Sequence, residues 1–178
     1  MDNAALDNTA LDNTALDNAD LARTVRRLAD RQELRDLTLR YCRAMDDSDW
    51  TALRTLFADQ PEAPGAETGD QTVARLRSVR STYGRTIHTP HGQLVEFADD
   101  DHATGLVPAH AELAVQGQTV VCAMRYYDDY VRQHGAWRFA RRQIKFVYAL
   151  PWPRLAGALT DDLPVHRPGT NAAPPDPF

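Results

Sequence analysis

Apolar positions recur with a helical period over the first part of the chain. Leu21, Val25 and Leu28 fit one helical stripe. Asp30 and Glu33 follow as an Asp-x-x-Glu pair, a pattern typical of a helix N-terminus, so we predict that a fresh helix starts there. The apolar face of this second helix consists of Leu34, Leu37, Tyr41 and Ala44.

An aspartate-rich segment over residues 46–49 marks the predicted end of that helix, because such side chains compete for the backbone hydrogen bonds of a helix. Asp49 can cap a short helix over residues 50–57. Residues 61–69 hold two prolines and two glycines, which predicts a loop. Asp70 then caps a third helix, whose predicted buried face consists of Val73, Leu76 and Val79.

From Thr86 onward the pattern changes to that of strands. Four stretches are rich in β-branched and aromatic residues, and turn sequences suited to hairpins separate them. The stretches are 86–97, 103–115, 119–132 and 136–150. Helices followed by an antiparallel meander make an α+β fold, and three N-terminal helices are available to cover one face of the sheet. Because a curved sheet closed by helices encloses an interior, we expect a pocket.

The two ends differ from the middle of the chain, so we expect an acidic leader over 1–20, one domain over 21–153 and a proline-rich tail over 154–178. In the leader, Ala-Leu-Asp-Asn recurs every five residues, a period that matches neither a helix nor a strand. We expect it to be disordered or partly helical; a pentapeptide-repeat solenoid is the alternative, for which three copies are too few. The tail from Leu163 offers little to pack, so we expect disorder there too.

Composition narrows the class of protein. With 43% hydrophobic and 25% charged residues, and no run near the ~20 apolar residues of a membrane span, the sequence is typical of a soluble globular protein. With a formal net charge of -5, the chain lacks the excess of basic residues that nucleic-acid binding requires. The five aspartates of residues 1–20 account for all of it, so the remaining chain is formally neutral, which favours an uncharged hydrophobic ligand. Two cysteines and the absence of a secretion signal favour a reduced, cytoplasmic protein.

The chain lacks the short motifs of several enzyme classes, namely those of nucleotide binding, serine hydrolases and zinc hydrolases. His88 and His91 lie three residues apart on a predicted strand, so their side chains point to opposite faces. No third ligand lies at a diagnostic spacing, and we therefore predict no metal site.

Four polar residues stand where apolar ones would pack better. Tyr41 lies on the buried helical stripe, Asp46 at that helix's end, His88 near the start of the first strand and Arg142 within the last strand. An aspartate beside a histidine can hold the imidazole in one tautomer, which leaves Nε2 free as a base. Each also has a structural interpretation: Asp46 could simply end its helix, and His88 could be a hydrogen-bonded core residue.

Three segments carry a family pattern. They are Tyr41-Cys42-Arg43-Ala44-Met45-Asp46-Asp47-Ser48-Asp49-Trp50, Thr86-Ile87-His88 with Leu94-Val95-Glu96-Phe97, and Tyr126-Tyr127-Asp128-Asp129-Tyr130 with Gly135-Ala136-Trp137-Arg138-Phe139 and Arg141-Arg142. In this order they resemble the SnoaL-like group of the nuclear-transport-factor-2-like (NTF2-like) superfamily, over about residues 21 to 153. The branch it resembles holds scytalone dehydratase, bile-acid 7α-dehydratase and hexachlorocyclohexane dehydrochlorinase. The resemblance implies a cone, in which a curved antiparallel sheet is closed by three N-terminal helices around a pocket.

The resemblance also implies residue roles. Asp46 and His88 match the aspartate-histidine pair of that branch. Tyr41 matches an assisting tyrosine or lysine, and Arg142 matches a pocket arginine of the last strand. Substrate contacts are expected from His110, Trp50 and Trp152.

Two positions depart from the family pattern. Some members have an assisting histidine or aspartate on the next strand, where the ungapped alignment places Leu113, beside His110 and Glu112. The loop over 59–70 holds prolines and glycines in place of a short strand, so the mouth of the pocket is expected to differ.

The implied function is cofactor-independent acid/base catalysis, in which His88 removes a proton and Asp46 stabilises the imidazolium. We expect a dehydratase or isomerase that acts on a small hydrophobic natural-product intermediate. A cyclase of a polyketide or terpenoid intermediate is the enzymatic alternative, and a non-catalytic ligand-binding or structural subunit is the alternative of another class. Epoxide opening, as in the limonene-epoxide hydrolase branch, is a third possibility, but it requires an Asp-Arg-Asp arrangement for which the predicted strands of this chain offer no suitable second aspartate. We expect no metal, nucleic-acid or membrane partner, and a homo-oligomer, a trimer in preference to a dimer.

Overall fold

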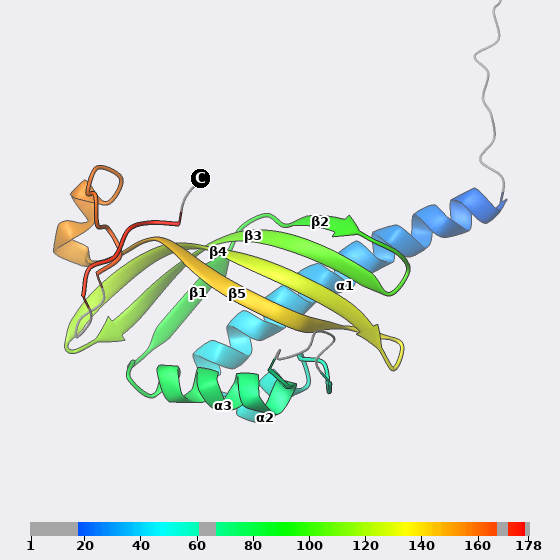
Figure 1. The fold of residues 1–178 in the computed structure, drawn as a ribbon, viewed down its shortest axis with the longest axis horizontal. Coiled ribbons are helices and arrows are strands. Elements are labelled where there is room, and N and C mark those ends of the chain that lie inside the picture. The colour runs from blue at the N-terminus through cyan, green and yellow to red at the C-terminus, as the bar shows by residue number, and fades with distance from the viewer. Residues whose placement is uncertain (1–17, 61–66, 167–170, 177–178) are drawn as a thin grey trace, which may run out of the picture.

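A computed structural model of the protein describes residues 18–60, 67–166 and 171–176 (Figure 1). Helices come first in the chain, namely α1 (Asn18–Asp47), α2 (Trp50–Arg54) and α3 (Gly69–Arg80). Strands follow, namely β1 (Thr86–Pro90), β2 (Leu94–Phe97), β3 (His102–Val115), β4 (Gln118–Gln133) and β5 (Ala136–Pro151), before the 3-10 helix η1 (Trp152–Gly157). The predicted α+β class is confirmed.

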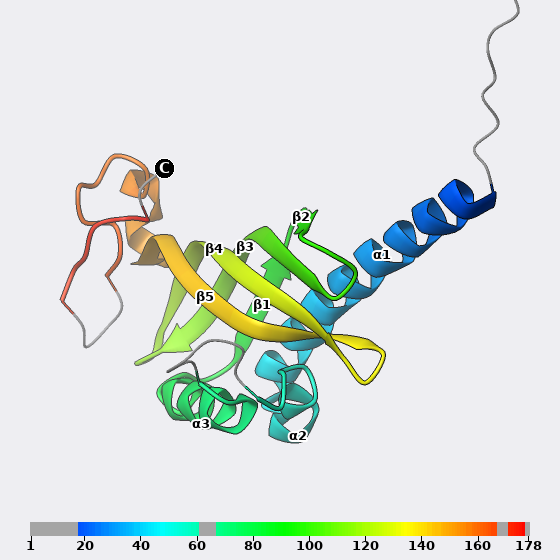
Figure 2. The ribbon, with the colours of Figure 1, turned by 45° about the vertical axis from the view of Figure 1, so that its right-hand side comes forward.

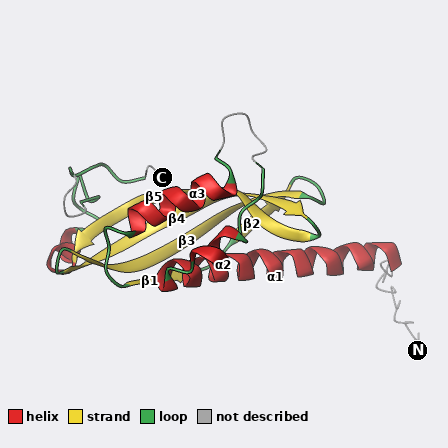
Figure 3. Ribbon diagram, turned by 90° about the horizontal axis from the view of Figure 1, so that it is seen from below, coloured by secondary structure: helices red, strands yellow, loops and turns green. Residues whose placement is uncertain are grey.

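The strands form one antiparallel sheet in the order β1-β3-β4-β5, and β2 pairs with β3 beside β1. The sheet is curved and not closed, and the three helices lie on its inner side (Figures 2 and 3). Burial alternates along β3, where Ala109 and Ala111 are buried and His110 and Glu112 are exposed. One face of the sheet therefore packs toward the helices, as the alternating sequence predicts.

The helix α1 runs without a break for 30 residues, so the predicted new start at Asp30 is wrong. Asp30 is buried inside the helix, where its carboxylate accepts hydrogen bonds from Trp137 Nε1 (3.0 Å) and Arg132 Nη2 (2.6 Å). These partners come from β4 and β5, more than 100 residues away along the chain. Long-range contacts thus explain a residue that looks locally like a helix cap.

Of the two N-terminal caps predicted for the shorter helices, one is correct and the other is wrong. Asp49 caps α2, since its side chain accepts from the amide of Ala52 (2.9 Å). The cap of α3 is Thr68 and not Asp70: the Thr68 hydroxyl and the Gln71 side chain form a reciprocal capping box. Asp70 is the second residue of α3 and accepts a hydrogen bond from Arg54 Nε (2.8 Å) instead.

The predicted strand over 86–97 is in fact two strands, β1 and β2, with residues 91–93 between them. Pro90 ends β1 because it has no amide hydrogen to continue the ladder. Both strands still pair with β3, so the sheet stays continuous.

The described parts of the tail pack against the sheet, contrary to the expectation from their proline content. Val165 bridges to Ala149 of β5 and to Ala173. The Asp176 side chain is inaccessible to solvent and accepts hydrogen bonds from Tyr127 (2.8 Å) and Arg125 (3.1 Å). Residues 1–17 of the expected disordered leader lie outside the described residues, and Asn18–Asp20 belong to α1. None of the described helices has the length and apolarity needed to cross a membrane.

Candidate functional site

The last turn of α1 lies against β1 and brings Asp46 to His88. Asp46 Oδ1 lies 2.6 Å from His88 Nδ1, and Oδ2 accepts the backbone amide of His88 (3.0 Å). Thr86 donates its hydroxyl to Oδ1 over 2.7 Å. The His88 and Asp46 side chains are 12% and 21% exposed, so the pair is largely shielded from water.

These hydrogen bonds determine the charge of Asp46. Burial raises the pKa of its carboxyl, but the His88 ring, the His88 amide and the Thr86 hydroxyl together outweigh burial and hold that pKa below its usual value. The carboxylate is therefore ionised at neutral pH and can only accept at Nδ1 of His88. This fixes the imidazole proton on Nδ1 and leaves the lone pair of Nε2 available as a base.

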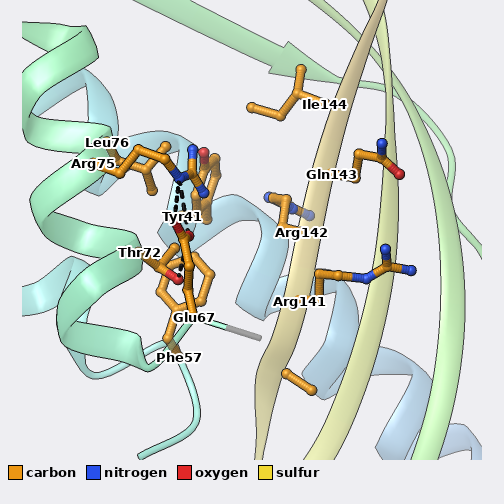
Figure 4. A pocket seen from close by; sticks show the side chains of 11 residues that line it. Tyr41, Phe57, Glu67, Thr72, Arg75, Leu76, Arg141, Arg142, Gln143 and Ile144 are labelled. Carbon is orange, nitrogen blue, oxygen red and sulfur yellow. Dashed lines mark hydrogen bonds and ion pairs between the residues drawn. The ribbon is translucent and has the colours of Figure 1, made fainter. Parts of the chain in front are cut away.

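His88 lines a cavity of about 270 Å³ between the sheet and the helices. Most of its walls are apolar, with Met45, Leu76, Leu113, Met124, Ile144 and Phe146 among the lining residues. A second cavity of about 490 Å³ adjoins it, because Tyr41, Arg75, Leu76 and Ile144 line both (Figure 4). Within the described residues, no group of three or more histidine, cysteine, aspartate or glutamate side chains is placed to hold a metal ion.

Tyr41 lies between the two cavities and is almost fully buried. Its ring makes edge contacts with Phe57, Tyr126 and Phe139. Burial raises the pKa of Tyr41 to about 12, although the positive charge of Arg142 acts in the opposite direction. The hydroxyl group is therefore protonated at neutral pH and can donate a hydrogen bond into the cavity space.

Arg142 lines the larger cavity and is held by a buried carboxylate. Its Nε and Nη2 each donate to Asp128 over 2.7 Å, and Nη2 also donates to the hydroxyl of Thr38 over 3.1 Å. Burial lowers the pKa of Arg142, but Asp128 outweighs it and keeps that pKa above its usual range. The guanidinium carbon lies 4.4 Å from the centre of the Tyr41 ring, within cation–π distance. Arg142 is thus a fixed cation in contact with Tyr41.

A β-bulge turns Arg142 inward. Tyr130 pairs with Phe139, but the next pair along the ladder is Asp129 with Arg141, so Ala140 is an extra residue on β5. Without it, strict alternation from the buried Phe139 would point Arg142 outward. The bulge therefore places Phe139 and Arg142 on the same face.

The structure brings together the four predicted catalytic residues, since Tyr41 and His88 line one cavity, Tyr41 and Arg142 line the other, and Asp46 contacts His88. It does not bring His110 there: this residue points to the opposite face, where its Nδ1 lies 2.6 Å from His91 Nε2. The ladder between β3 and β4 keeps its register past Pro108, so no bulge turns His110 inward.

Both predicted substrate-binding tryptophans also lie away from the two cavities. Trp50 is the first residue of α2 and packs against the core, with the Arg77 guanidinium carbon 6.0 Å from its ring centre. Trp152 lies in η1 with 59% of its surface exposed. Leu113 does line the His88 cavity, as the ungapped alignment indicates, whereas Glu112 is exposed on the other face.

Sequence reasoning missed several residues of the site. Thr86 could have been found, because it lies two positions before His88 on one strand and so shares its face. Asp128 had no comparable signal, since its pairing with Arg142 depends on the bulge. Arg80, which lines the His88 cavity, lies on a predicted helix with no motif around it.

Comparison with known proteins decides the family. The sequence profile described as SnoaL-like domain matches residues 26–143, about two thirds of the chain. The chain belongs to the SnoaL-like family. Comparison of this SnoaL-like protein with curated proteins gives no match.

Solved structures show which fold the SnoaL-like chain adopts. A scytalone dehydratase candidate from Novosphingobium aromaticivorans is 19% identical, with a TM-score of 0.66 over 85% of this chain and 96% of that chain. Hexachlorocyclohexane dehydrochlorinase LinA-type3 from Novosphingobium barchaimii is 20% identical, with a TM-score of 0.65 over 72% and 93%. An NTF2-like protein from Novosphingobium aromaticivorans is 26% identical, with a TM-score of 0.55 over 72% and 88%. These similarities confirm the NTF2-like cone.

Proposed function

We propose that this SnoaL-like protein is a cofactor-independent acid/base enzyme, a lyase of the dehydratase type or an isomerase, whose base is His88. The observation that carries the proposal is the 2.6 Å contact between Asp46 Oδ1 and His88 Nδ1 beside an apolar cavity. The names of two similar structures, a scytalone dehydratase candidate and a dehydrochlorinase, also denote elimination reactions.

In the proposed reaction, His88 Nε2 removes a proton from a substrate carbon next to an electron-withdrawing group. The ionised Asp46 carboxylate stabilises the imidazolium that forms. In a dehydratase, the electron pair of the broken C–H bond becomes a new C=C bond as the neighbouring C–O bond breaks. The leaving hydroxide takes the proton from His88 and departs as water, so that the enzyme returns to its starting state.

Tyr41 and Arg142 have supporting roles in this proposal. The protonated hydroxyl of Tyr41 donates a hydrogen bond to the leaving oxygen or to an oxyanion that develops on the substrate. Arg142, whose guanidinium contacts the Tyr41 ring, adds a fixed positive charge next to Tyr41. In an isomerase the same groups act, but His88 returns the proton to a different carbon.

The cavity favours an enzyme over a non-catalytic structural subunit, because a structural cone has no need for an open space beside a connected pair. The test uses a metabolite extract of the source organism and untargeted mass spectrometry. The wild-type protein is expected to convert a compound with loss of one water or with no change of mass, and His88→Ala is expected to lower that rate by about a hundredfold or more. Near-full conversion by folded His88→Ala would show that His88 is not the base.

A further inference from the structure

One arginine lines the His88 cavity without a carboxylate partner. Arg80, the last residue of α3, donates from Nε to the main-chain oxygen of Met45 (3.3 Å) and from Nη1 to that of Tyr83 (3.0 Å). Both acceptors are neutral. In the described ranges of the chain, Arg80 takes part in no ion pair, and its Nη2 has no hydrogen-bond partner.

The two main-chain bonds place this cation beside the catalytic pair. Met45 directly precedes Asp46, and Tyr83 lies three residues before Thr86, which hydrogen-bonds Asp46. The guanidinium is therefore anchored to both segments that carry the pair. Asp46 does not neutralise it by direct contact, because its carboxylate is directed to His88 and Thr86.

The rest of this cavity also lacks negative charge among the described residues. Besides Arg80, the other arginine among the lining residues is Arg75, and no lining residue is an aspartate or a glutamate. The partner of Arg75 is Glu67, at 2.9 Å, which lines the neighbouring cavity and not this one. A cation that faces a mostly apolar space without a counter-ion is unfavourable, and a bound anion would relieve that cost.

We propose that the His88 cavity takes an amphipathic carboxylic acid, which has an apolar body and one carboxylate, and that Arg80 binds the carboxylate. The inference rests on the proposed function in one respect, that the ligand of this cavity is the substrate of His88. The carboxylate is an anchor remote from the reacting carbon, because a carboxylate only weakly acidifies a neighbouring C–H bond. The formally neutral charge of residues 21–178 thus conceals a local positive charge at the site.

A matched pair of probes tests the inference by calorimetric titration at neutral pH and low salt. 1-Naphthaleneacetate and 1-naphthaleneacetamide share one skeleton and differ in charge. The wild-type protein is expected to bind the acetate at least about tenfold more tightly, as one charged hydrogen bond supports. Arg80→Gln is expected to remove this preference by weakening the acetate alone. Arg77→Gln is the control, since Arg77 lies on the same helix but faces Trp50 and does not line the cavity.

Equal affinities of the wild type for the two probes, or no binding of either, would overturn the inference. A preference that survives Arg80→Gln, or an equal loss in Arg77→Gln, would do so too. A crystal structure of the wild type with the acetate needs no variant: a carboxylate bound to Arg80 supports the inference, and one bound elsewhere refutes it. His88→Asn separates the two proposals, because it is expected to keep the acetate preference even though turnover is lost.

Discussion

The carboxylate of Asp128 accepts two hydrogen bonds of 2.7 Å from the guanidinium of Arg142. Both side chains are buried, since that of Asp128 is 0% exposed and that of Arg142 is 2% exposed. Tyr130 donates a further hydrogen bond to the same carboxylate over 2.7 Å. Because the guanidinium also contacts the Tyr41 ring, this pair connects the core of the sheet to the candidate site.

Removing the charge of Asp128 is expected to destabilise the protein strongly. Asp128→Asn leaves Arg142 buried without a counter-ion, a change that costs about 3–5 kcal/mol in comparable cases. Urea unfolding measures the change in the free energy of unfolding. The control is Asp129→Asn, because Asp129 pairs with Arg141 at the next position of the same ladder, where both side chains are exposed. The free energy of unfolding of Asp129→Asn is expected to fall by less than about 1 kcal/mol. Equal losses for the two variants would contradict the prediction.

Asp46 is expected to determine the tautomer of His88. In the wild type, neutral His88 should carry its proton on Nδ1, because Asp46 is an ionised acceptor at 2.6 Å from that atom. Nitrogen NMR of the imidazole distinguishes the two tautomers directly. Asp46→Ala removes the acceptor and should shift the population toward the Nε2–H form. A wild-type spectrum dominated by Nε2–H would mean that His88 is not oriented as proposed.

The same aspartate predicts a stability difference that depends on pH. The pKa of Asp46 is lower in the folded protein than its ordinary value of 3.8, so folding favours the ionised form. Its contribution is complete above pH 3.8 and is lost as the pH falls through the folded pKa. Asp46→Asn should therefore be less stable than the wild type at neutral pH, and the gap in the free energy of unfolding should narrow near pH 3. If the stability difference between the wild type and Asp46→Asn widened on acidification, the pKa of Asp46 would not be lowered by folding.

Tyr41→Phe is expected to separate catalysis from packing. The substitution keeps the ring that contacts Phe139 and Arg142 and removes only the hydroxyl group. Turnover should fall by about a hundredfold if that hydroxyl stabilises the developing oxyanion, whereas the free energy of unfolding should change by about 1 kcal/mol or less. Tyr148→Phe is the control, since Tyr148 packs near His110 on the outer face. Unchanged turnover in folded Tyr41→Phe would exclude the proposed role.

Much of the fold follows from local patterns in the sequence. The period-2 alternation of β3 predicts which face is buried, and Asp49 predicts the start of α2. Local patterns failed where a distant partner decides the outcome. Asp30 has the context of a helix cap but lies inside α1, where Trp137 and Arg132 of the sheet donate hydrogen bonds to its Oδ1.

For the candidate site, the sequence alone determined the residue types and their places at a helix end and near a strand start. The family resemblance implied that Asp46 and His88 form a pair, and the folded structure supplies their contact. The sequence did not determine which side chains lie on the same face of the sheet on either side of a β-bulge. Alternation along a strand predicts facing only while the ladder is regular, and the extra residue Ala140 reverses it for Arg142. The pairing between β4 and β5 decides where that residue is accommodated, so only the tertiary structure places Arg142 against Asp128 and Tyr41.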